Sequence, residues 1–219
     1  MPTTSIIPQI KEQLQQPLPG KEAQYKMATS TRMPYKKKSV PEGVRIASVL
    51  CLLYPKEGKL HLPLIQRVIA KGDKHSGQMS FPGGKLEASD KSKQAGALRE
   101  ANEEIGILSE DVVMLGALTS LYVPASNFQV FPFVGYLDYK PTFIRQEREV
   151  AEVVEVALAD LIAPQSLKYK SMQFRENYTV KNVPYFDVNN KVVWGATGMM
   201  LSEFVEVINQ VNNSTIKST

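Results

Sequence analysis

Residues 84–107 read GKLEASDKSKQAGALREANEEIGI, a glycine turn followed by a short helical pattern with three glutamates near its end. In a helix, Glu100, Glu103 and Glu104 lie three and four positions apart, so their side chains share one face. Carboxylates at that spacing repel one another, and a divalent cation such as Mg2+ would offset the repulsion because it prefers carboxylate oxygens. On the hexamer REANEE alone, an acidic face exposed to solvent is the commoner explanation.

The flanking residues favour a loop, a helix and a second loop. Upstream, FPGG at 81–84 combines a proline of fixed φ with two permissive glycines, so its backbone can approach a phosphate or a metal ion. Ser89 or Asp90 is expected to cap the helix N-terminus, and Gly106 is expected to end the helix. We expect the acidic face to turn toward the glycines. The opposite, apolar face is expected to consist of Leu98, Ala101 and Ile105.

The stretch resembles the Nudix box, whose family pattern is Gly-x5-Glu-x7-Arg-Glu-U-x-Glu-Glu-x-Gly-U, where U is a bulky aliphatic residue. Asp90 stands where the pattern has its first glutamate, eight residues instead of seven separate it from Arg99, and Ala101 is small. The resemblance implies an α/β protein with the Nudix α/β/α sandwich around a mixed β-sheet. The matching positions are Arg99, Glu100, Glu103, Glu104, Gly106 and Ile107.

A second resemblance concerns the substrate. LIQR at 64–67 and KHSGQMSFPGG at 74–84 resemble the signature of the coenzyme A pyrophosphatase branch of Nudix hydrolases, which commonly has the longer spacing seen here. The resemblance implies a pyrophosphohydrolase that cleaves coenzyme A or its derivatives to 3′,5′-ADP and 4′-phosphopantetheine or its acyl form. Looser matches occur at 126–130, 132–135 and 193–197, and the matches together span roughly residues 44 to 205.

The resemblance also implies roles for single residues. Two or more Mg2+ or Mn2+ ions are expected at Glu100, Glu103, Glu104 and the Gly84 carbonyl. Because Nudix enzymes often draw a further ligand or base from a loop outside the box, Glu149 and then Glu147 are candidates, although a solvated acidic loop explains either equally well. Catalytic roles fall to Glu100, Glu104, Glu149 and Arg99, of which Arg99 is expected to orient the glutamates.

Phosphate contacts are expected from the residues that lead into the glycine turn. Coenzyme A carries a pyrophosphate and a 3′-phosphate, and arginine and lysine are the side chains that bind such groups. Ordinary loop charges explain Lys71 and Lys74 equally well, and His75 is assigned to binding or to ordering the loop. The substrate-binding candidates are Arg67, Lys74, His75, Gln78 and Gly83.

Composition sets the remaining expectations. The chain has 219 residues with 43% hydrophobic and 22% charged content, which suits one soluble domain. A net charge of +4 with no nucleic-acid-binding motif indicates attraction of a small anionic nucleotide rather than nucleic acid. The single Cys51 lies in an apolar run, and a reducing, cytoplasmic setting fits it. The sequence contains no apolar stretch or leader pattern that predicts association with a membrane. Nudix proteins are often dimers, so a homodimer is possible.

We expect a helix and arm at 1–43 that packs on a Nudix hydrolase domain at 44–211, followed by a frayed polar tail at 212–219. Residues 17–41 are expected to form an ordered arm or loop, and Pro55–Gly58 a hairpin turn. Strands are expected at 44–54, 60–66, 112–121, 129–137, 153–157, 178–186 and 191–194, and helices at 6–16, 159–162 and 201–211.

Three alternatives stay open at this stage. The substrate can be another nucleoside diphosphate derivative, such as ADP-ribose or a dinucleotide. The chain can be a non-catalytic Nudix-fold binding module, although such a module does not need all three glutamates. It can also hydrolyse oxidised or non-standard nucleoside triphosphates. Product analysis separates these functions.

Overall fold

The computed structural model describes residues 6–33, 39–69, 76–175 and 178–217. Its strands are β1 (Arg45–Lys56), β2 (Lys59–Arg67), β3 (Met79–Ser80), β4 (Gly83–Lys85), β5 (Val113–Ala117), β6 (Leu121–Val123), β7 (Phe128–Tyr136), β8 (Val150–Ala157), β9 (Leu167–Arg175), β10 (Tyr178–Val188) and β11 (Lys191–Val193). Its helices are α1 (Ile7–Gln13), α2 (Gly20–Gln24), α3 (Lys93–Ile105), α4 (Leu158–Ile162) and α5 (Gly195–Lys217), with short 3-10 turns at Tyr25–Met27, Ser109–Asp111 and Pro164–Ser166.

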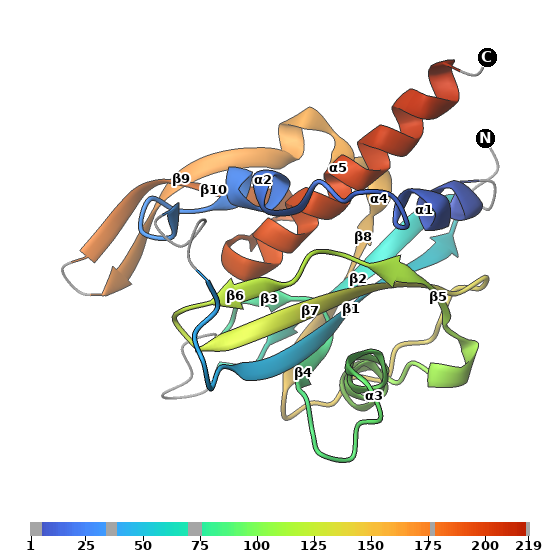
Figure 1. Ribbon diagram of the computed structural model, residues 1–219, viewed down its shortest axis with the longest axis horizontal. Coiled ribbons are helices and arrows are strands. Elements are labelled where there is room, and N and C mark those ends of the chain that lie inside the picture. The colour runs from blue at the N-terminus through green and yellow to red at the C-terminus, as the bar shows by residue number, and fades with distance from the viewer. Residues whose placement is uncertain (1–5, 34–38, 70–75, 176–177, 218–219) are drawn as a thin grey trace.

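A mixed sheet forms the centre of the molecule. Eight strands of the described chain join in the order β3-β2-β1-β7-β5, with β4 beside β1, β6 beside β7 and β8 beside β2. β1 and β7 run parallel, whereas the other described pairs are antiparallel. Helix α3 covers one face of this sheet, and α5 crosses the other face (Figure 1). The expected α/β/α sandwich is confirmed.

Strand β1 contributes side chains to both layers. Leu50, Leu52 and Tyr54 pack in the cluster under α3, and Cys51 and Leu53 pack in the cluster under α5. Successive strand residues point to opposite faces, so a central strand covered on both sides reads as a continuous apolar run. This is why 44–54 lacks alternation and why Cys51 is buried, as expected.

The helical elements between residues 7 and 27 pack on α5. The helix expected at 6–16 is confirmed as α1, whereas the arm or loop expected at 17–41 contains α2 and the 3-10 turn after it. Ala23 and Met27 are buried there, so tertiary contacts stabilise a helix too short to form alone. In Figure 1 both α1 and α2 lie beside α5, and Leu14 at the end of α1 also packs against Gly116 of β5.

Several strands differ from expectation. The strand expected at 112–121 is interrupted, since β5 ends at Ala117 and β6 begins at Leu121. Strand β9 is not among the strands expected from the sequence. It pairs with β10 in a second sheet of order β11-β10-β9, which extends to the side of the molecule (Figure 1). The strands expected at 178–186 and 191–194 are confirmed as β10 and β11, which join in a hairpin at Asn189 and Asn190, both with positive φ, at 50° and 61°.

The C-terminal helix is longer than expected. Helix α5 begins at Gly195, six residues before the expected start at 201, and continues to Lys217, so the frayed tail expected from 212 is helical that far. Phe204 and Ile208 of its apolar stripe are fully buried. Burial of this stripe against the sheet and α1 stabilises the helix beyond its local signals.

Within the described part of the chain, no helix combines the length and apolar character that a membrane crossing requires.

A buried carboxylate connects the N-terminal segment to the fold. Glu203 of α5 is fully buried and accepts hydrogen bonds from the Gly20 N–H at 3.1 Å, from Gln24 Nε2 at 2.8 Å and from the Thr119 N–H at 3.2 Å. Three donors from two other segments therefore satisfy one charged group. Burial of a carboxylate requires such donors.

Substitution of Glu203 by alanine should lower the free energy of unfolding by about 3 kcal/mol, because one buried and two partly buried donors lose their acceptor. Urea denaturation of the purified protein measures this. Glu206→Ala is the matched control: this residue lies on the same helix but pairs with Lys26 on the surface, so its loss should cost less than about 1 kcal/mol. Equal effects of the two substitutions would contradict the anchoring role.

Candidate active site

Helix α3 has well-defined ends. The Ser92 side chain caps the N-terminus by accepting the Ala95 N–H at 3.0 Å, and Gly106 ends the helix in the left-handed region at φ 74°. The expected Gly106 terminus is confirmed, whereas the expected cap by Ser89 or Asp90 is wrong. Asp90 cannot serve as the cap because its carboxylate is bound elsewhere.

Asp90 is the partner of Arg99. The Arg99 guanidinium donates to Asp90 Oδ1 at 2.9 Å and lies 3.0 Å from Glu100 Oε1 and 2.9 Å from Glu103 Oε2. The hydrogen bonds from Arg99 hold the pKa of Asp90 below its usual range. The Arg99 guanidinium thus orients Glu100 and Glu103, and Asp90 holds Arg99 in place.

Glu104 turns toward the glycine turn. Its side chain is buried, and its Oε2 accepts the Gly83 N–H at 2.8 Å. Burial, and after it the nearby charge of Glu100, raise the pKa of Glu104 to about 8, against the lowering effect of the Gly83 N–H. A carboxylate that is costly to ionise in isolation becomes a favourable ligand once a cation is present.

Glycine is required at both positions of the turn. Gly83 has φ +150°, and a Cβ there would lie 2.4 Å from the Ser48 carbonyl oxygen of β1. A Cβ on Gly84 would lie 2.6 Å from both carboxylate oxygens of Glu100. The turn therefore lets the backbone of β4 approach the two glutamates more closely than any other residue type allows.

Glu149 shares the electrostatic environment of these glutamates. Burial raises the pKa of Glu100, Arg99 opposes this rise, and the charges of Glu103 and Glu149 add to it. Glu149 also raises the pKa of Glu104. Its carbonyl accepts the N–H of Val68, the residue that follows β2, so the loop before β8 lies against the end of β2.

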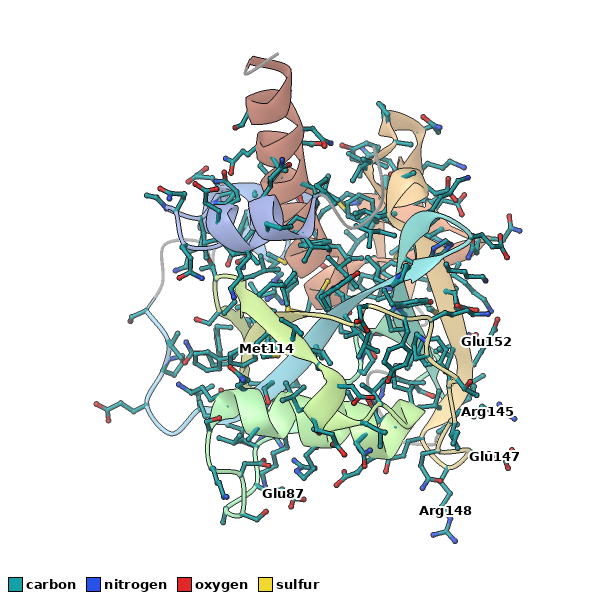
Figure 2. The ribbon with its side chains drawn as sticks, turned by 90° about the vertical axis from the view of Figure 1, so that its right-hand side faces the viewer. Glu87, Met114, Arg145, Glu147, Arg148 and Glu152 are labelled. Atoms are coloured by element: carbon teal, nitrogen blue, oxygen red, sulfur yellow. The ribbon has the colours of Figure 1, made fainter. Side chains whose placement is uncertain are left out.

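Glu147 lies apart from this group. Its side chain is 78% exposed and pairs with Arg145 at 3.3 Å. Figure 2 shows Glu147 and Arg148 directed outward from the loop before β8. The two other glutamates of this acidic run are engaged elsewhere, since Glu152 pairs with Lys191 and Glu155 with Lys56. The geometry therefore favours Glu149 over Glu147.

The substrate-binding candidates lie beside the acidic side chains. Arg67 ends β2, and its charge lowers the pKa of Glu104. The Arg67 N–H donates to the Gln78 carbonyl at 3.0 Å, which joins the two sequence segments 64–67 and 76–84. Lys74 and His75, like Lys71, lie outside the described residues.

The sequence did not predict one cleft beside the candidate site. Gln78 lines a cleft whose other wall comes from β9, β11 and the turn before β11, and β9 was not expected to exist. Lys168 and Lys170 alternate along one face of β9, and this alternation is the sequence signal that could have indicated the strand.

The donor set fits a hard divalent cation. Glu100 and Glu104 converge on the Gly83–Gly84 turn, and carboxylate and carbonyl oxygens are the ligands that Mg2+ and Mn2+ accept. Glu103 is engaged by Arg99, and the described residues contain no group of three or more His, Cys, Asp or Glu side chains gathered around a common metal position. In this arrangement two of the three expected glutamates face the turn.

Comparisons with known proteins agree with this description. The model of the NUDIX domain family matches residues 44–178. A Pectobacterium atrosepticum protein named "Uncharacterized Nudix hydrolase NudL" is 35% identical over 140 residues, which are 64% of this chain and 71% of that protein. The Yersinia enterocolitica protein of the same name is 33% identical over 136 residues, or 62% and 68% of the two chains. A solved MutT/nudix family protein from Enterococcus faecalis is 19% identical, with a TM-score of 0.49 over 88% of this chain and 73% of its own.

In EDTA, where no metal ion is bound, Glu104→Gln should raise the stability of the folded protein, and the gain should increase as the pH rises. The pKa of Glu104 is raised to about 8, so its contribution to stability is fully present below the ordinary pKa near 4.5 and is lost as the pH approaches 8. Glutamine never ionises, so its advantage should be smaller at pH 5 and should grow by at least about 1 kcal/mol by pH 8.5.

Thermal denaturation at several pH values in EDTA measures this difference. Glu103→Gln is the matched control on the same helix, since its side chain is 55% exposed and no buried charge is removed with it. A Glu104→Gln advantage that stays constant between pH 5 and 8.5 would show that the carboxylate is not destabilised by burial.

Proposed function

The chain belongs to the NUDIX domain family, and we propose that this Nudix hydrolase cleaves the diphosphate of coenzyme A or its derivatives with Mg2+ or Mn2+ bound. One observation carries the proposal. The two segments that resemble the coenzyme A signature are joined by the Arg67–Gln78 hydrogen bond, and both end beside Glu104, with Gly83 donating to it. The substrate signature and the acidic residues therefore form one site.

The metal ions would be held by Glu100, Glu104 and Glu103, with the Gly84 carbonyl as a further oxygen ligand. When bound, such ions neutralise the diphosphate and lower the pKa of a coordinated water. Glu103 would have to exchange its contact with Arg99 for this role, and its exposure leaves room for that movement.

The side chains of this chain supply the remaining steps. Arg67 binds a non-bridging phosphate oxygen, and Arg99 keeps Glu100 in place. Glu149 or Glu100 accepts a proton from the attacking water. The water oxygen forms a bond to one phosphorus, the bridging P–O bond breaks, and the bridging oxygen leaves with the other phosphate. The products are 3′,5′-ADP and 4′-phosphopantetheine.

Other functions remain outcomes of the same assay. A hydrolase of ADP-ribose, of a dinucleotide or of nucleoside triphosphates would use the same carboxylates. A non-catalytic binding module would not require the buried, unfavourably placed carboxylate of Glu104, whose pKa is raised to about 8. That energetic cost favours an enzyme over a binding module.

Purified protein with Mg2+ or Mn2+ should convert coenzyme A to 3′,5′-ADP and 4′-phosphopantetheine, and EDTA should stop the reaction. Chromatography of the products measures this, with ADP-ribose, a dinucleotide and nucleoside triphosphates in parallel. Glu103→Gln and Glu104→Gln should each lower kcat by at least about 100-fold, because each removes a metal ligand. Glu110→Gln, an exposed glutamate in the turn after α3, is the control and should retain activity.

Cleavage of ADP-ribose without cleavage of coenzyme A would retain the metal site and reject the substrate. Wild-type turnover by folded Glu104→Gln would reject the metal assignment. Absence of turnover with every compound would favour the binding module.

Glu149→Gln should lower kcat by about 100-fold if Glu149 takes the proton from water. Glu147→Gln is the matched control two residues away, with a side chain that pairs with Arg145 on the surface. Steady-state kinetics with coenzyme A distinguishes them. A full kcat in Glu149→Gln would transfer the role of general base to Glu100.

A further inference from the structure

A cleft lies between the central sheet and the second sheet. Its volume is about 570 Å³, which is in the range of small-molecule sites. One wall consists of Gln66 at the end of β2 and residues 76–79 leading into β3. The other wall consists of residues 170–173 of β9, residues 190–192 and Trp194.

The charge of the cleft is positive. Among its described lining residues are Lys170 and Lys191 and no acidic residue. Lys191 Nζ is bound to Gln66 Oε1 at 2.9 Å and to Glu152 Oε2 at 2.6 Å, so its charge is compensated. Lys170 forms no salt bridge within the described part of the chain, and its Nζ lies 5.1 Å from the centre of the Tyr185 ring. An uncompensated ammonium in a concave site attracts an anion.

The remaining lining suits a nucleobase. Trp194 lines the cleft and is half-buried. Met79 and Met172 add polarisable apolar surface, and Gln78 lies on the wall opposite Trp194. Aromatic and thioether groups pack against flat rings.

The cleft adjoins the acidic site. Gln66 of the cleft wall directly precedes Arg67, whose charge acts on Glu104. Met79 of the wall is four residues from Gly83, a separation of at most about 13 Å along an extended chain. A single elongated ligand can therefore occupy the glycine turn and the cleft together.

Coenzyme A offers one end that matches this chemistry. Beyond its diphosphate, the nucleoside end carries an adenine and a 3′-phosphate, whereas the pantetheine arm carries no charge. We propose that the cleft is the specificity pocket for the phosphorylated nucleoside end of the substrate, with Lys170 on the 3′-phosphate and Trp194 against the base. The assignment rests on the proposed function and explains how the site would prefer coenzyme A to ADP-ribose, which lacks the 3′-phosphate.

Tryptophan fluorescence tests this pocket directly, because Trp194 is the single tryptophan of the chain. The protein in EDTA is titrated with 3′,5′-ADP, with 5′-ADP and with 4′-phosphopantetheine. We expect 3′,5′-ADP to change the emission and to bind at least about 10-fold more tightly than 5′-ADP, which corresponds to one charge-assisted contact.

Lys170→Met should remove the preference for 3′,5′-ADP. Lys168→Met is the matched control, since Lys168 lies on the same strand, pairs with Asp187 at 2.7 Å and does not line the cleft. It should keep the preference. In turnover assays, Lys170→Met should raise KM for coenzyme A by about 10-fold and leave KM for 3′-dephospho-coenzyme A unchanged.

Three results would overturn the proposal: equal affinity of the wild type for the two ADP compounds, a preference that survives in Lys170→Met, or an emission change caused by 4′-phosphopantetheine alone. The last result would assign the cleft to the pantetheine arm. Because the fluorescence titration needs neither metal nor turnover, it tests the pocket even if coenzyme A is not hydrolysed. A failure of the proposed function is therefore distinguishable from a failure of the pocket.

Discussion

The hydrogen bond from the Gly83 N–H to the buried Glu104 carboxylate, 2.8 Å long, joins the parts of the structure on which the candidate site depends. It connects α3 to the glycine turn, and the turn pairs with β1 through Val49 and Gly83. A side chain at position 83 would collide with the Ser48 carbonyl oxygen, so the contact requires glycine there. Helix, turn and central strand therefore constrain one another through a single charged group.

The charges around this contact are arranged at a cost to stability. Glu104 is buried, and the charges of Glu100 and Glu149 raise its pKa further, although Arg67 opposes them. Arg99 is not free to neutralise the group, because Asp90 occupies two of its nitrogens. The sequence departure at position 90 thus has a physical meaning: its carboxylate holds the arginine that orients the glutamates. Sites that retain such unfavourable charge are typical of catalytic centres.

Local sequence patterns predicted the elements whose causes are local. The apolar face of α3, the Gly106 terminus and the buried strand β1 follow from spacing and residue type, and the structure agrees. The break between Ala117 and Leu121 and the helix α2 depend on contacts with distant residues. Glu203, for example, accepts hydrogen bonds from the backbone N–H groups of both segments. No pattern within a short window contains that information, which is why these elements were missed.

The same distinction separates chemistry from specificity in this molecule. The glutamates of α3 lie within five residues of one another, so their shared face is visible in the sequence. The cleft joins Gln66 to Lys170 and Trp194, more than one hundred residues further along the chain, and part of its wall is β9, which pairs with β10. A substrate that spans both regions would contact α3 and the glycine turn at one end and the second sheet at the other. The carboxylates would determine which bond breaks, and the second sheet would determine which molecule is held there.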